Sequence, residues 1–421
     1  MRHPRTAATV VALALALALA GCGGSGPSNG GNTFGNALTI YTALPTDGPQ
    51  GRLMQSFEYG ETLAVTEAHN VVDGRLISPV YVSDASGTAG GWDTTDVSNA
   101  ATTATQNLDA VAYIGDFDSA ATATSLPITS AADILQVSPA SPYIGLTDPS
   151  VYDVKGEPAS YYPSGVQTFA RLVPSDAQEA SATTSFMHSL GVQSLYTLED
   201  NDPGNTPFDS VIGTMVGADA AHAEITLAGT AQTDTATDTT LAQYAPVVKA
   251  IAATHADAVF VASAADPGVE ALWQELYAKL PGVKLFAPST LATGPFRESL
   301  GAAAGATYVT SPILPLNQYG PQAQGVLRHY REEFRGSAPT AWSLYGYEAM
   351  ESVLAAIKKA GKHANDRRTV VSAYFHLGWR DSVIGRYRIT PNGDTSQARF
   401  VGYRAGANGQ LIEIRRHLGG A

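Results

Sequence analysis

The stretch "AYIGDFDSAATATSLPI", residues 112–128, joins a short apolar run to a run of small residues. The first run is typical of a buried strand and the second of a helix. Asp116, Asp118 and Ser119 fall at the junction, where the helix would begin. The free N–H groups of a helix N-terminus are satisfied by capping side chains and also attract bound anions. The stretch therefore predicts a strand-to-helix turn that acts as a helix cap, a ligand loop, or both.

Strand and helix patterns alternate on either side of this turn. Strand-like runs at 38–44, 75–84 and 133–142 are interleaved with helical patterns at 53–70 and 93–107. This order predicts a parallel sheet with helices on both faces. A second run of the same kind follows, with strand candidates at 194–200, 222–230, 257–266 and 283–290. The chain is therefore predicted to contain two α/β units.

Length and composition agree with a folded protein of two domains. The chain has 421 residues, which exceeds the usual length of a domain with one hydrophobic core. Its apolar content of 44% is that of a folded protein. Its net charge of −13 argues against nucleic acid or an anionic membrane surface as a partner. The nine histidines lack metal-ligand spacing, and "DNDPGN" at 200–205 lacks the calcium-loop pattern. No metal or cofactor is predicted.

The N-terminus has the features of a bacterial export signal. Residues 9–20, "TVVALALALALA", form an apolar segment after a positively charged start, and "LAGC" follows at 19–22. This ending resembles the lipobox of bacterial lipoproteins, with cleavage before Cys22 and a lipid on its thiol. Cys22 is the only cysteine, which agrees with that use. We expect a signal peptide at 1–21 and a flexible tether at 22–35; the alternative is a chance cysteine in a plain signal peptide.

Five segments in order resemble one known family. They are 112–128, 134–147, 167–180, 344–361 and 382–394. The chain resembles the substrate-binding lipoproteins of bacterial branched-chain amino acid ABC transporters, which have the type I periplasmic-binding-protein fold. The resemblance implies an α/β fold of two lobes, each a mostly parallel sheet flanked by helices, joined by three hinge crossovers. A ligand would bind in the cleft between the lobes.

The resemblance also implies the lobe boundaries. The first lobe would be 36–167 plus 308–377, and the second 168–307 plus 378–421. Independently, residues 384–406 have the pattern of an antiparallel hairpin with Asn392-Gly393 at its turn.

First-lobe site residues follow from the same resemblance. Ser119 matches a hydroxyl that holds the ligand's carboxylate, with Phe117 and Asp118 in the same loop. Ala140 and Ser141 match a second loop that contacts the ligand. Asp118 is interpreted as a cap, and the role of Asp116 stays open between capping and ligand contact. Two carboxylates beside an anion site would repel a carboxylate ligand, so a cation or polyol suits them better.

The second lobe departs from the family pattern. Ser289 stands where the family has an acid that pairs with the ligand ammonium. Asp202 and Asp266, on loops of the same lobe, are candidates for the missing carboxylate. Trp92 and Tyr319 are candidates for aromatic lids over the ligand, with ordinary packing as the alternative. These departures affect the predicted ligand and not the predicted fold.

We therefore expect a solute-binding lipoprotein of an ABC-type importer that captures a small polar ligand, such as an amino acid or amide. Its partners would be permease subunits and the membrane, reached only through the lipid, with the protein itself monomeric and extracytoplasmic. One alternative is a sensor of the same fold without transport. A hydrolase is a remote alternative, because the chain has no G-x-S-x-G elbow or P-loop, although a triad can assemble from distant residues. No enzymatic activity is expected.

Overall fold

The structure is a computed structural model that describes residues 36–85, 91–148, 156–202, 207–208, 210–263, 268–292 and 294–419. The predicted signal peptide, Cys22, the whole of the predicted tether and Asp266 lie outside these ranges. Within them, no helix combines the length and the apolar character needed to cross a membrane.

The first sheet is built around the N-terminal strand. Its order is β2 (Val71–Val72), β3 (Arg75–Ser83), β1 (Ala37–Leu44), β4 (Ala110–Ile114), β5 (Leu135–Ser138) and β6 (Phe169–Arg171). All neighbours are parallel except β2 and β3. Every residue of β4 is buried, because helices cover both faces, and its sequence is accordingly a continuous apolar run.

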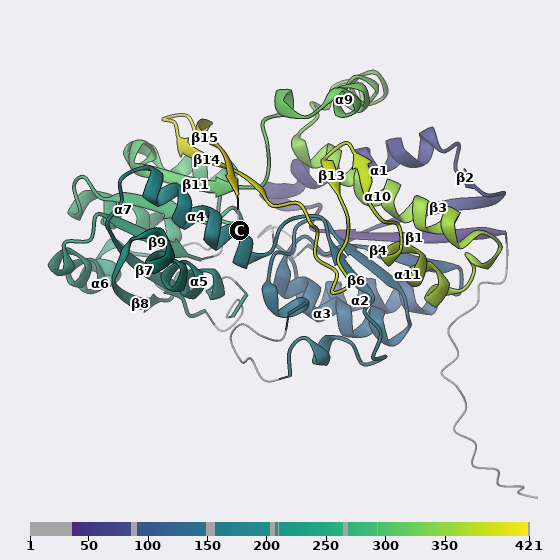
Figure 1. Ribbon diagram of the computed structural model, residues 1–421, viewed down its shortest axis with the longest axis horizontal. Coiled ribbons are helices and arrows are strands. Elements are labelled where there is room, and N and C mark those ends of the chain that lie inside the picture. The colour runs from purple at the N-terminus through teal and green to yellow at the C-terminus, as the bar shows by residue number, and fades with distance from the viewer. Residues whose placement is uncertain are drawn as a thin grey trace, which may run out of the picture.

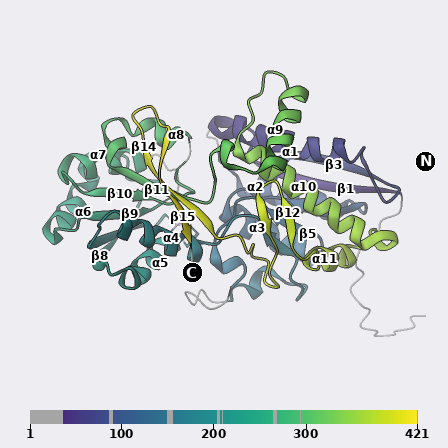
Figure 2. The ribbon, with the colours of Figure 1, turned by 45° about the horizontal axis from the view of Figure 1, so that its top comes forward.

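Helices sandwich this sheet (Figures 1 and 2). One face carries α1 (Gly51–Glu67), α10 (Ala341–Ala360) and α11 (Arg367–Phe375), whose apolar side chains share one core with β1 and β4. The other face carries α2 (Thr94–Gln106), which packs against α3 (Ser119–Ala131). A further helix, α9 (Pro321–Glu333), packs on α1 and α10.

The second sheet contains the middle of the chain and its C-terminal hairpin. Its order is β15 (Leu411–Gly419), β14 (Arg399–Ala405), β11 (Thr307–Ser311), β10 (Lys284–Ala287), β9 (Ala258–Ala262), β7 (Ser194–Asp200) and β8 (Thr226–Thr233). The strands from β8 to β11 are parallel, and β14 and β15 are antiparallel additions.

Two separate cores hold this second sheet between helices. One is shared with α4 (Asp176–Ser189) and α5 (Val211–Ala220), and the other with α6 (Leu241–Thr254) and α7 (Val269–Lys279). Two α/β units with mostly parallel sheets were predicted from the sequence, and this architecture is confirmed.

The chain passes between the two sheets three times. Sheet membership places these crossovers at 172–175, 312–320 and 388–398. Each lies after the boundary predicted from the sequence, because the strand nearest the boundary stays with the preceding unit. β6 pairs in the first sheet and β11 in the second. The small ladder of β12 (Arg380–Ser382) and β13 (Gly385–Tyr387) packs into the core of the first unit through Tyr387.

The hairpin predicted at 384–406 is present only as its turn and a short antiparallel pairing beside it, where Ile389 bridges Thr395 and the Ser396 N–H donates to the Arg388 carbonyl at 2.9 Å. The Thr390 N–H donates to the Asp394 carbonyl at 2.8 Å, which closes the turn around Asn392 and Gly393. The flanking strands find other partners, since β13 pairs with β12 and β14 with β11 and β15. The reason is topological: the turn lies inside a crossover, so its two sides lead to different sheets.

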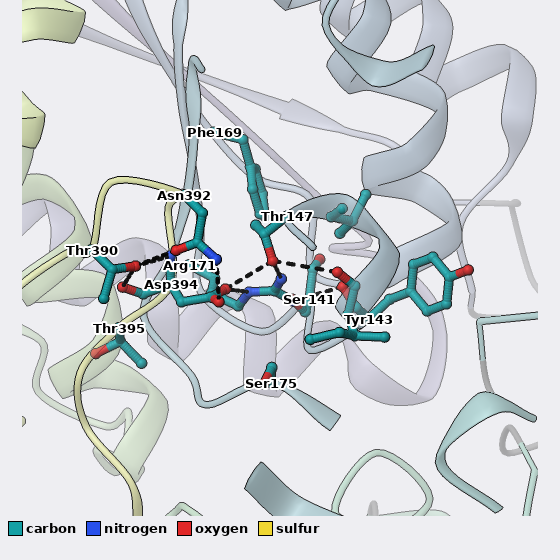
Figure 3. Close-up of polar contacts among 12 residues, drawn as sticks. Ser141, Tyr143, Thr147, Phe169, Arg171, Ser175, Thr390, Asn392, Asp394 and Thr395 are labelled. Carbon is teal, nitrogen blue, oxygen red and sulfur yellow. Dashed lines mark hydrogen bonds and ion pairs between the residues drawn. The ribbon is translucent and has the colours of Figure 1, made fainter. Parts of the chain in front are cut away.

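An ion pair with a buried guanidinium joins the last strand residue before the first crossover to the third crossover (Figure 3). Arg171, the last residue of β6, has a fully buried side chain whose Nε lies 2.8 Å from Oδ1 of Asp394. Its Nη1 donates to the carbonyls of Ser141 and Tyr143, each at 2.8 Å, and its Nη2 to the hydroxyl of Thr147. One guanidinium therefore fixes the loop after β5 and the turn of the third crossover in place.

Backbone contacts pin the same turn from the other side. The Arg171 N–H donates to the Gly393 carbonyl at 2.9 Å, and Gln167 Nε2 donates to the Asn392 carbonyl at 2.8 Å. Gly393 has a φ of 98°, and a Cβ there would lie 2.2 Å from the Phe169 carbonyl oxygen. Only glycine satisfies both the conformation and this close approach.

We predict that Asp394→Ala lowers the free energy of unfolding by about 3 kcal/mol, because the buried guanidinium of Arg171 loses its counter-charge. Equilibrium urea unfolding measures this. The matched control is Asp381→Ala, whose pair with Arg386 spans 3.6 Å and is mostly exposed. The free energy of unfolding of that variant should fall much less. Equal losses in the two variants would contradict the role given to the buried pair.

Candidate functional site

A cleft of about 1310 Å³ lies between the two units. Loops at the carboxyl ends of the parallel strands line it, represented by Asp84 after β3, Phe117 after β4, Ala140 after β5 and Ser289 after β10. This is the usual position of ligands in open α/β sheets. The volume exceeds the roughly 300–1,000 Å³ of typical small-molecule pockets, so the cleft has room to close around a ligand.

Buried carboxyl groups form the floor of the cleft on the first unit. Asp116 is fully buried, and it accepts hydrogen bonds from the Tyr113 hydroxyl at 2.8 Å and from the Ser125 hydroxyl. Asp84, also fully buried, lies beside Asp116 and reaches the cleft surface. Asp116 is thus neither a cap nor a cleft residue: it is part of the hydrogen-bonded support under Asp84.

Burial raises the pKa values of both acids of this pair, and the nearby Asp116 raises that of Asp84 further. Desolvation, followed by the Asp116 charge, raises the pKa of Asp84 to about 8. Desolvation raises the pKa of Asp116 to about 6. Hydrogen bonds from Ser125 and Tyr113 favour its charged form and so oppose this rise. At neutral pH the two carboxyl groups therefore share a proton.

Asp118 caps α3, as the sequence predicted. Its Oδ1 accepts from the N–H groups of Ala120 at 2.8 Å and Ala121 at 3.4 Å. The indole N–H of Trp92 also donates to this carboxylate. Both Asp118 and Trp92 line the cleft. The helix N-terminus that faces the cleft is therefore already occupied by an anion of the protein itself.

The neighbours of Asp118 give this wall hydroxyl and aromatic surface. Ser119 lines the cleft, and its hydroxyl oxygen accepts from the Tyr143 N–H at 3.2 Å. Phe117 meets the ring of Trp342, the second residue of α10, edge to face at 4.8 Å between ring centroids. Trp342 is a cleft residue that the sequence did not indicate.

Two acids at the start of α4 form the opposite wall. Glu179, 2% exposed, accepts hydrogen bonds from the N–H of Ser289 at 2.6 Å and from its hydroxyl at 2.5 Å. Asp176 is 3% exposed, and its Oδ2 has no hydrogen-bond partner among the described residues. Burial raises the pKa of Glu179 to about 8 and that of Asp176 to about 7.

These two acids were not among the predicted site residues. The candidates for the missing carboxylate were Asp202 and Asp266, on loops of the second lobe, whereas Glu179 reaches Ser289 from 110 residues away. The available signal was the spacing of Asp176 and Glu179, which places both acids on one face of the first helical turn. That turn directly follows the first crossover and therefore faces the cleft.

Other predicted residues lie elsewhere. Ser141 is fully buried and its hydroxyl hydrogen-bonds to that of Thr122 at 2.7 Å, so it supports the cleft wall without lining it. Tyr319 lies in the core of the first unit, and its hydroxyl oxygen accepts from the Leu314 N–H. Asp202 does not line the cleft, where Trp92, Phe117, Asp118, Ser119, Ala140 and Ser289 do.

Comparison with known proteins agrees with this geometry. Residues 39–410 match the model of a family described as periplasmic binding protein. The chain belongs to the periplasmic binding protein family. No curated protein matches it in sequence.

Solved structures of this family share the fold at low sequence identity. A leucine-binding protein from Thermotoga maritima has a TM-score of 0.72 at 20% identity, over 90% of this chain and 98% of that one. An ABC transporter substrate-binding protein from Desulfitobacterium hafniense, solved with Leu, has a TM-score of 0.71 at 20% identity, over 90% of this chain and 100% of that one. A solute-binding protein from R. palustris, solved with benzoate, has a TM-score of 0.69 at 16% identity, over 91% of this chain and 97% of that one.

Family membership confirms four predictions. The resemblance stated from the sequence and the two-lobe type I fold are correct, and the two units described above are the two lobes. The family consists of binding proteins, so the chain is a binding protein and not an enzyme. Its members act outside the cytoplasm, which places this chain there as well.

The raised pKa of Glu179 predicts that stability falls as pH rises. Its folded value of about 8 lies above the ordinary 4.5, so the native state binds more protons than the unfolded state between these values. From pH 5 to pH 8 the wild type should lose on the order of 2 kcal/mol more than Glu179→Gln. Denaturant unfolding at both pH values measures this difference. Glu270→Gln, at an exposed site outside the cleft, is the control, and equal slopes for wild type and Glu179→Gln would contradict the assignment.

Proposed function

We propose that this protein is the extracytoplasmic solute receptor of an ABC-type importer, tethered to the membrane by a lipid on Cys22. One observation carries the proposal: a large cleft lined by polar and aromatic groups from both lobes, in a chain of the periplasmic binding protein family. The lipobox-like "LAGC" at 19–22 supports the anchor. A lipid tether keeps the receptor close to the permease while residues 22–35 leave it free to turn.

Binding would proceed by closure of the lobes around the ligand. A ligand favours the closed form only if it contacts both lobes, since its differential affinity for the two forms drives the change. Asp84 and Asp118 offer contacts from the first lobe, and Asp176 and Glu179 from the second. The crossovers absorb the rotation, with the Arg171–Asp394 pair as their fixed point. The permease would then recognise the closed pair of lobes.

The transport role is tested by uptake in a strain that lacks the gene. A thermal-shift screen of the purified mature chain first identifies the ligand, because a compound that binds only the native state raises its Tm. Uptake of the radiolabelled compound should then fall at least tenfold in the deletion strain and return with the wild-type gene. Unchanged uptake would contradict the transport role and leave a ligand sensor of the same fold as the alternative.

The anchor is tested by Cys22→Ser in the complementing gene. The variant should leave the membrane fraction, and uptake should drop because the receptor is no longer concentrated beside the permease. Ser25→Ala, in the same tether, is the control and should remain membrane-bound. Retention of Cys22→Ser in the membrane fraction would contradict lipid attachment.

Leucine, isoleucine and valine should bind weakly or not at all. Their carboxylate would have to approach the N-terminus of α3, where Asp118 already accepts the available N–H groups. Isothermal titration calorimetry of the mature chain checks this. A micromolar or tighter affinity for leucine would contradict the prediction.

A further inference from the structure

The charged groups that line the cleft are unevenly distributed. Four carboxyl groups reach it among the described residues, two from each lobe: Asp84, Asp118, Asp176 and Glu179. Three of them are at least 97% buried, and Asp118 is partly exposed to the cleft. The two lobes therefore face each other with acidic groups, and a cation placed between them would favour the ionised form of each.

The cations that line the cleft stand apart from these acids. Arg52 lies at the exposed start of α1. Arg297 lies on α8 (Gly294–Ser299), where its guanidinium donates to the Gly409 carbonyl. Among the described residues, neither arginine has a hydrogen bond or ion pair with the four acids, whose hydrogen bonds come from N–H groups and hydroxyls. The one described cation whose charge acts on them is the buried Arg171, which lowers the pKa of Asp176 and does not line the cleft.

The N-terminus of α3 is the best place for a ligand anion in the first lobe, but a side chain of the protein occupies it. A helix N-terminus attracts anions through its unpaired N–H groups and its partial positive charge. There the Asp118 carboxylate accepts two backbone N–H groups and the indole N–H of Trp92. A ligand carboxylate at this position would compete for the same donors and would be repelled by the carboxylate already present.

Two of the acids that line the cleft, Asp84 and Asp176, have buried carboxyl oxygens that lack a full set of hydrogen-bond donors. Asp176 Oδ2 is buried and has no hydrogen-bond partner among the described residues, and no side chain of those residues other than Asp116 pairs with the Asp84 carboxyl. A buried polar atom without a partner costs free energy, which a ligand N–H group would recover. Asp84 and Asp176 lie on different lobes, so a donor held between the lobes satisfies both walls.

Aromatic rings complete the first-lobe wall. Trp92, Phe117 and Trp342 all line the cleft, and Trp92 is tied to Asp118 through its indole N–H. The face of an aromatic ring attracts cations, tryptophan most strongly. The combination of aromatic faces with carboxyl groups is therefore suited to an ammonium group attached to an apolar body.

We propose that the ligand is an organic cation, an amine or a quaternary ammonium compound without a carboxylate, held between the acids of the two lobes. This inference rests on the proposed function and names the chemical class of its ligand. Asp118 excludes the carboxylate, Asp84 and Asp176 receive the ammonium, and the aromatic rings cover the apolar part. Compounds of this class differ from amino acids in lacking the carboxylate.

Matched pairs of compounds test this directly. Each pair differs by one carboxylate: isoamylamine and leucine, cadaverine and lysine, putrescine and ornithine, choline and betaine. Thermal shifts of the full mature chain are measured at pH 7.5 and low salt. At least one amine or quaternary ammonium member should raise the Tm while its carboxylate partner leaves it unchanged. The inference is overturned if no such member raises the Tm, or if a carboxylate partner raises it more.

Variants of the second lobe then test the site. Asp176→Asn keeps the size of the side chain and removes its charge, and it should weaken binding of the active amine at least tenfold in calorimetry. Glu179→Gln should act in the same direction. Glu270→Gln changes the net charge equally at an exposed site outside the cleft and should leave the Kd unchanged. An unchanged Kd in both cleft variants would overturn the assignment.

Asp118→Ser gives a test by gain of binding. Serine is a good neutral N-cap, so the helix should persist while the built-in anion is lost. The variant should bind the amine less tightly and leucine at least tenfold more tightly than the wild type. Amine binding as tight as in the wild type, with no gain for leucine, would overturn the role of Asp118.

Failure of this inference can be told apart from failure of the proposed function. If the compound taken up through this protein is a carboxylate, the ligand class is wrong and the transport role stands. If an amine binds and its uptake is unchanged in the deletion strain, the ligand class stands and the transport role fails.

Discussion

The structure depends on one buried guanidinium. Arg171 has no solvent around its side chain, and a buried charge is tolerated only when its donors are satisfied. Asp394 supplies the counter-charge, while the carbonyls of Ser141 and Tyr143 and the hydroxyl of Thr147 accept the remaining N–H groups. Because these acceptors come from the loop after β5 and from the third crossover, the hinge and one wall of the cleft share a single rigid support.

The cleft wall is built from that support outward. Ser141 is held through its carbonyl by Arg171 and passes the restraint to Thr122 through its hydroxyl, so the start of α3 is fixed as well. Asp118 is thereby held at the helix N-terminus. The acids around it are stable where they are because each has hydrogen-bond donors or shares a proton, as Asp84 does with Asp116.

Local sequence patterns predicted the strands, helices and cap, because these depend on neighbours in sequence. The buried run of β4 and the capping by Asp118 are of this kind. The contact of Glu179 with Ser289 spans 110 residues and has no local signature. The inward direction of Ser141 and the buried position of Tyr319 likewise follow from tertiary packing. The fold was therefore predictable to a greater extent than the composition of the cleft.

Carboxyl groups on both lobes also affect the empty receptor. Closing the cleft without a counter-ion would bring like groups from the two lobes together in a shrinking volume of low dielectric. As pH rises through 7 to 8 and these acids lose their protons, the unliganded molecule is increasingly biased towards its open shape by its own charges. A loaded molecule then differs from an empty one in its electrostatics as well as its outline. A partner that recognises the closed shape would seldom bind an empty receptor, so most of the complexes that form would carry ligand.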